Sequence, residues 1–136
     1  MNTIRSPRMR QILPASFLLA SAVFFSLPSA AQDGHALVQD EYHPGTRVDL
    51  DGDQDEVYRA VQNGDIRPFS EMYAAVERDL HGRIIQVELD QDDGIWIYEL
   101  KLNQNNNIIK VEYNAASLEM LEIKGRHFRD ALKPTE

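Results

Sequence analysis

An acidic stretch holds the densest set of potential metal-binding side chains in the sequence. Asp49, Asp51, Asp53 and Asp55 occupy alternate positions, and Gly52 lies among them. Calcium is bound by oxygen ligands at alternate positions around a glycine that turns the chain. These four aspartates are therefore a candidate Ca²⁺ site, and residues 49–56 would then serve a protein that senses a cation or another small ligand.

The register of this stretch does not fit an EF-hand loop. If Gly52 takes the sixth loop position, Arg47 takes the first and Tyr58 the twelfth, and neither residue can supply the expected carboxylate. The alternative is that Asp53 or Asp55 caps a helix that begins here, since the N-terminal end of a helix favours acidic side chains. The spacing favours this helix cap over the metal site.

Groups that could catalyse a reaction are present, but their spacing does not form an active site. Asp79 and His81 are two residues apart on a predicted helix and point in different directions, so they do not form a triad with Ser70. His35 and His43 are eight residues apart, which fits no metal-ligand motif. The sequence also has no HExxH motif, no glycine-rich phosphate loop and no cysteine. We therefore expect a protein that is not an enzyme and that needs no cofactor apart from the candidate Ca²⁺.

Residues 1–31 have the layout of a secretory signal peptide. Three arginines precede an apolar stretch, and the segment ends with small residues at Ser29 and Ala31. We expect cleavage after Ala31 and a periplasmic location, without stable membrane insertion afterwards. An uncleaved membrane anchor is the alternative, and it is disfavoured because the apolar stretch falls short of the roughly 20 residues that span a bilayer.

The chain that remains after this cleavage is short and acidic. Of the 136 residues, 105 remain (136 minus 31), which suffices for one small domain. They carry 11 basic residues (14 minus 3) and 22 acidic ones, a formal charge of −11. Such a charge repels nucleic acid and anionic membranes, so neither is an expected partner. Without cysteine, no disulfide stabilises the domain.

Three runs of alternating apolar and polar residues between Arg83 and Tyr113 predict an antiparallel meander. Turn-forming residues separate the runs at Asp90–Gly94 and Asn103–Asn107. The apolar residues expected to share a face are Ile85, Val87 and Leu89 in the first run, Trp96, Tyr98, Leu100 and Leu102 in the second, and Ile109, Val111 and Tyr113 in the third. One face of this sheet needs an apolar cover.

Two predicted helices supply that cover, which makes the fold class α+β. Residues 55–62 predict a short helix, and the longer pattern from Pro68 to His81 predicts the helix that packs on the sheet. Residues 32–52 are expected to form a flexible acidic lead-in. Residues 118–123 predict a short fourth strand. The basic tail at residues 124–136 could dock on an acidic partner, fold back on the domain or remain disordered.

Residues 53–123 resemble the PepSY domain. The resemblance lies in residues 55–60, in Asn63-Gly64-Asp65-Ile66 with Pro68-Phe69, in residues 82–88, and above all in Trp96-Ile97-Tyr98-Glu99-Leu100-Lys101. The family often ends with an Asp-Ala-x-Thr-Gly turn, in whose place this chain has Asn114-Ala115-Ala116-Ser117-Leu118. The resemblance implies one or two N-terminal helices packed on an antiparallel meander of three to four strands.

The resemblance also implies a function without chemistry. PepSY domains occur in propeptides of secreted metallopeptidases and in small exported proteins thought to modulate proteases or envelope signalling. The expected function is a binding module that regulates a partner in the periplasm, either an envelope protease or the periplasmic domain of a two-component sensor kinase. Trp96, Tyr98 and Tyr113 are candidate binding residues if they are exposed, because aromatic side chains often dominate binding interfaces.

Overall fold

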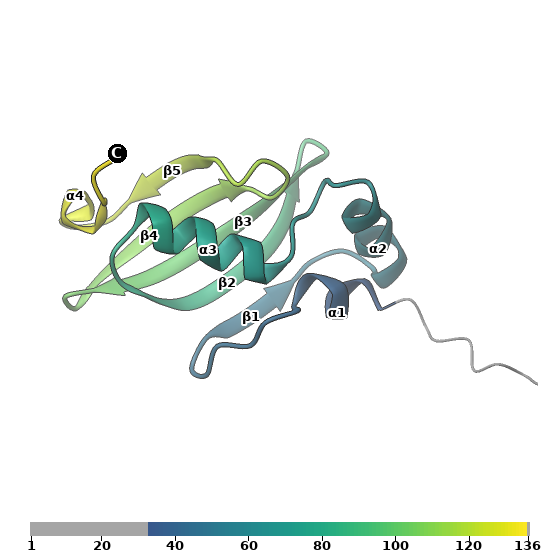
Figure 1. Cartoon of the computed structure of the whole chain (residues 1–136), viewed down its shortest axis with the longest axis horizontal. Helices are drawn as coiled ribbons and strands as arrows, with labels where there is room; N and C mark the ends of the chain where they lie inside the picture. Colours follow the sequence, from purple (N-terminus) through teal and green to yellow (C-terminus); the bar gives the residue numbers. More distant parts are fainter. Residues whose placement is uncertain (1–32, 136) are drawn as a thin grey trace, which may run out of the picture.

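A computed structural model describes residues 33–135 as an α+β domain with a five-stranded mixed sheet (Figure 1). The predicted signal peptide, residues 1–31, lies outside the described residues. No helix within residues 33–135 is both long enough and apolar enough to cross a membrane. The strands follow the order of the sequence across the sheet: β1 (Arg47–Leu50), β2 (Arg83–Asp92), β3 (Ile95–Gln104), β4 (Asn107–Asn114) and β5 (Met120–Lys124).

Strands β2 to β5 pair antiparallel, as the alternating pattern predicts. Tight turns with positive φ join the first three of them: Asp93 and Gly94 have φ of 48° and 78°, and Asn105 and Asn106 have φ of 49° and 63°. Two consecutive residues with positive φ form a turn whose twist matches that of the two strands of a hairpin. The predicted fourth strand is present as β5, which begins at Met120 rather than at residue 118.

The sheet is mixed rather than antiparallel throughout, because β1 joins the predicted meander in parallel. Val48 pairs with Val87 and Leu50 with Leu89. Part of the expected flexible lead-in is therefore ordered: it contains β1 and a short helix, α1 (Gly34–Val38), whose Val38 is fully buried. The apolar side chains of Val48 and Leu50 pack against the core, which draws this segment onto the sheet.

A bulge in β2 changes which isoleucine faces the core. Ile84 pairs with Leu102 and Gln86 pairs with Lys101, so Ile85 is the extra residue between them. Ile84 packs against the core, whereas the sequence pattern assigns Ile85 to that face. The predicted alternation is correct from Val87 onwards.

Helices α2 (Gln54–Gln62) and α3 (Phe69–Asp79) provide the cover (Figure 1). The side chain of Asp53 accepts a hydrogen bond from the Glu56 amide at 2.9 Å, which confirms the predicted N-terminal cap. The apolar stripe of α3 is buried in one core with the inward side chains of β2, β3 and β4. We call this side of the sheet the covered face and the opposite side the open face.

The C-terminal segment folds back on the domain, one of the three expectations for the basic tail. A short helix, α4 (Phe128–Ala131), buries Ala131 in the core. Leu132 forms a β-bridge with Leu80, and the His81 amide donates to the Ala131 carbonyl at 2.7 Å. This pairing holds Leu80 in an extended conformation, so α3 ends at Asp79, two residues earlier than the sequence predicts.

Candidate functional site

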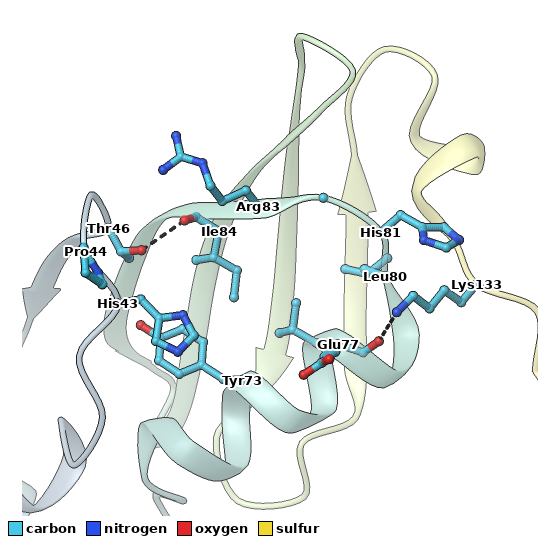
Figure 2. A pocket seen from close by; sticks show the side chains of 12 residues that line it. His43, Pro44, Thr46, Tyr73, Glu77, Leu80, His81, Arg83, Ile84 and Lys133 are labelled. Carbon is cyan, nitrogen blue, oxygen red and sulfur yellow. Dashed lines mark hydrogen bonds between the residues drawn. The ribbon is translucent and has the colours of Figure 1, made fainter.

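A groove with a volume of about 490 Å³ lies between α3, the start of β2 and the loop before β1 (Figure 2). Its size falls within the range of about 300–1,000 Å³ that is common for ligand pockets. We call it the α3–β2 groove. Its lining residues are His43, Pro44, Thr46, Tyr73, Val76, Glu77, Leu80, His81, Gly82, Arg83, Ile84 and Lys133.

The deep part of the α3–β2 groove is apolar. Val76 lies in α3 and Leu80 directly follows that helix. The side chain of each is 3% exposed. Ile84 enters from β2 and is partly buried against the same core. The groove therefore reaches down to the hydrophobic core, and an apolar side chain placed there would be removed from water.

One wall of the groove is an aromatic stack. The rings of His43 and Tyr73 lie 3.8 Å apart between centroids and are inclined by only 8°. His43 Nε2 lies 2.7 Å from Glu41 Oε1, and the Thr46 hydroxyl donates to the Ile84 carbonyl at 3.0 Å. Burial, and secondarily the charge of Glu41, raises the pKa of Tyr73, so its hydroxyl stays neutral at ordinary pH. These contacts fix the loop against β2 and give the wall a defined shape.

The rim of the groove carries positive charge in an otherwise acidic protein. Lys133 reaches in from the C-terminal segment, the His81 ring is exposed near the end of α3, and the Arg83 guanidinium points away from α3 (Figure 2). The Lys133 ammonium donates to the Glu77 carbonyl, and its backbone amide donates to the Asp79 carbonyl at 2.8 Å. Glu77 is the one carboxylate among the lining residues. The rim thus favours an anionic group.

The groove has the chemistry of a binding site. Its twelve lining residues include no cysteine and no serine, and Thr46 already donates its hydroxyl to a backbone carbonyl. Apolar walls with a small number of polar groups that fix orientation are typical of ligand sites. The groove can hold a ligand that combines an apolar part with a carboxylate or another anion.

The three aromatic residues predicted as binding candidates lie in the core. Trp96 is 6% exposed, and Tyr98 and Tyr113 are fully buried. The Tyr98 hydroxyl donates to the Arg67 carbonyl, and the Tyr113 hydroxyl donates to Asp79 Oδ2 at 3.1 Å. Burial is the main cause that raises the pKa of both tyrosines. Their side chains stabilise the fold and are not available to a partner.

The four aspartates of the candidate Ca²⁺ site do not form a ligand set. Asp49 lies in β1 and Asp53 caps α2, while Asp51 and Asp55 are exposed beside them. Throughout residues 33–135, no group of three or more acidic, histidine or cysteine side chains is placed to hold a metal ion. The two histidines that were considered as a metal pair have separate contacts. His35 lies within hydrogen-bond distance of Gln54 and Gly52, whereas His43 lines the α3–β2 groove.

Comparison with known proteins finds no matching family model, no matching curated protein and no matching solved structure. The resemblance to the PepSY domain, including the arrangement of its helices and strands, therefore stays a prediction.

The sequence pattern alone does not reveal the α3–β2 groove. Its residues come from three separate parts of the chain, residues 43–46, residues 73–84 and Lys133. One signal was present: basic residues gather in the C-terminal segment of a strongly acidic chain. That signal marks Lys133 but not the apolar floor beneath it.

Proposed function

We propose that this protein is a non-enzymatic, exported binding module that regulates a partner protein in the periplasm. The α3–β2 groove holds a segment of that partner, which is an envelope protease or the periplasmic domain of a two-component sensor kinase. The observation that carries the proposal is an apolar groove with a cationic rim on an acidic domain. Export rests on the signal-peptide pattern of residues 1–31.

The groove suits a segment of a larger molecule because it opens to the surface. Glu77, His81 and Arg83 at its rim are exposed, while Val76 and Leu80 below them are buried. A partner segment would place an apolar side chain on this floor and a carboxylate near Lys133, whose ammonium lies at the rim and can donate to a carboxylate oxygen. When the groove holds this segment, the segment can no longer reach the catalytic or signalling site of the partner.

Affinity capture from the envelope of the native cell tests this function. The protein is expressed from the full 136-residue sequence with an affinity tag, and bound proteins are identified by mass spectrometry after crosslinking. Lys133→Glu reverses the rim charge, and Arg59→Glu makes the same change on the exposed side of α2, away from the groove. Wild type and Arg59→Glu should recover a protease or a sensor kinase, and Lys133→Glu should recover at least about tenfold less.

The proposal fails in two ways that this design separates. Equal recovery by Lys133→Glu and Arg59→Glu would remove the groove as the binding site. Recovery of neither a protease nor a sensor kinase by the wild-type protein would remove the regulatory function itself. Circular dichroism of both variants checks that their fold is unchanged.

A further inference from the structure

The open face of the sheet carries a row of acidic side chains that crosses every strand. Asp49 pairs with Glu88, Glu88 with Glu99, Glu99 with Glu112, and Glu112 with Glu122. Residues that pair across a sheet lie side by side on the same face. These five carboxylates form what we call the acidic row. With strands about 4.8 Å apart, the row is roughly 19 Å long.

A second row runs parallel to the first, two residues away along each strand. Arg47 pairs with Gln86, Gln86 with Lys101, Lys101 with Lys110, and Lys110 with Lys124. We call these five residues the basic row, in which Gln86 is the one neutral member. The two rows lie roughly 7 Å apart, because two residues of a strand span about that distance.

Charges within each row are poorly compensated inside the domain. Like charges on directly opposed residues repel and destabilise a sheet. Across the described part of the open face, one ion pair joins the two rows, between Lys124 and Glu122 at 3.0 Å. Glu122 is also the main cause that raises the pKa of Lys124, and the charges of Glu112 and Glu99 contribute further along the acidic row. The sheet therefore keeps two adjacent stripes of opposite charge that are free to interact outward.

This pattern is complementary to itself. A two-fold axis that runs between the two rows, parallel to them, exchanges the acidic row of one molecule with the basic row of another. We propose that the open face binds the open face of a second copy of this chain, with acidic row against basic row. Each strand then lies over the same strand of the second copy, as an isologous interface requires.

The central strands make the most specific contacts in this arrangement. Glu99 of one copy lies over Lys101 of the other, and Glu112 lies over Lys110. Facing sheets keep their strand directions within about 30° of each other, which preserves these central contacts even where the outer strands diverge. Beyond the rows, Ile97 of one copy comes beside the half-exposed Ile108 of the other, on the neighbouring strand. These isoleucines add apolar contact at both margins.

A second copy fits this face better than other partners do. Nucleic acid would be attracted to the basic row and repelled by the acidic row beside it. An unrelated protein would need two opposed stripes of the same spacing, which a second copy provides by symmetry. The interface leaves the apolar floor of the α3–β2 groove and Lys133 free, because these residues lie on the covered side of the sheet. This proposal therefore stands or falls independently of the proposed function.

Sedimentation velocity of the protein expressed from its full sequence tests the pairing. We expect dimers at about 0.05 M salt and monomers at about 0.5 M, because salt screens exposed charges. Glu99→Lys with Glu112→Lys makes both rows basic at the centre, and Lys101→Glu with Lys110→Glu makes both acidic. Each double variant should dimerise at least about tenfold more weakly than the wild type.

Two further samples separate specific pairing from a general effect of net charge. A mixture of the two double variants should form heterodimers, because their faces are complementary. The fourfold variant, which exchanges the central charges of the two rows, keeps the net charge and should dimerise as the wild type does. A monomeric wild type at low salt would overturn the proposal. So would stronger association of Glu99→Lys with Glu112→Lys, since that result would follow from reduced net charge alone.

Discussion

The two faces of the sheet are built from alternate residues of the same strands, yet different forces act on them. On the covered face, Tyr98, Leu100 and Leu102 of β3 are buried in one apolar core beneath α3. On the open face of that strand, Glu99 and Lys101 remain partly exposed in the acidic row and the basic row. Burial of apolar side chains on the covered face stabilises the fold. The open face carries charged side chains, and the strand register determines which of them lie side by side. The difference separates residues that specify the fold from residues free to specify a partner.

Adjacent residues Trp96 and Ile95 give the sharpest test of this difference. Trp96→Ala should lower the free energy of unfolding by about 3–5 kcal/mol, because it removes a buried ring from the core. Ile95 is 51% exposed on the open face, so Ile95→Ala should change stability by less than about 1 kcal/mol. Urea unfolding monitored by circular dichroism measures both values. A loss below about 1 kcal/mol for Trp96→Ala would contradict its place in the core.

Removal of the hydroxyl group from a buried tyrosine should change stability more than its removal from an exposed one, by a smaller amount than the loss of Trp96. Burial raises the pKa of Tyr98 above its ordinary value of about 10, so the folded state favours the neutral phenol. The stability linked to this group is complete below about pH 10 and is lost as the pH rises towards the higher folded-state pKa. Tyr98→Phe should cost about 1 kcal/mol at neutral pH through loss of the hydrogen bond to Arg67, and should make the alkaline loss of stability shallower.

The control for this experiment is Tyr42→Phe. Tyr42 is 70% exposed, so its substitution should leave both neutral stability and alkaline sensitivity unchanged. Urea unfolding from neutral pH to about pH 11 provides both readings. If Tyr98→Phe retains the same alkaline fall as the wild type, then Tyr98 is not among the groups that cause it, and Tyr113 becomes the main candidate.

The smallest expected effect lies on the open face. Glu99 is flanked by Glu88 and Glu112 in the acidic row. Glu99→Gln should raise the free energy of unfolding by roughly 0.2–1 kcal/mol in dilute protein at low salt, because it relieves repulsion between like charges. The gain should disappear at high salt, where exposed charges are screened. Glu119→Gln is the control, because Glu119 is exposed outside the acidic row. Destabilisation by Glu99→Gln would show that the row is already compensated within one molecule.

The covered face could be predicted from the sequence because its signals are local. Alternation along β3 marks Trp96 and Tyr98 as neighbours on one face, and turn chemistry places the hairpins at Asp93–Gly94 and Asn105–Asn106. The start of α2 could be predicted with Asp53 or Asp55 as its cap, because the N-terminal end of a helix favours acidic side chains. The predicted face of Ile85 was wrong, because a β-bulge shifts the alternation of inward and outward side chains without any change in sequence composition.

The open face and the groove could not be predicted because they depend on residues that are distant in the sequence. Alternation shows that Glu88 and Glu99 point outward, but only the strand register shows that they lie side by side. Strand β1 was missed for a related reason. Its four residues include only Val48 and Leu50 as an apolar pattern, and their partners in β2 are far along the chain.

Strand β1 has a consequence for the order of folding. In the hairpin between β2 and β3, Gln91 pairs with Trp96 across a two-residue turn, whereas Arg47 must find Gln86 with α2 and α3 in between. Closing the longer loop costs more chain entropy, and non-local pairings form late. The strand that leaves the ribosome first should therefore be the last to join the sheet. Amides of β1 should accordingly exchange with deuterium sooner than those of β3.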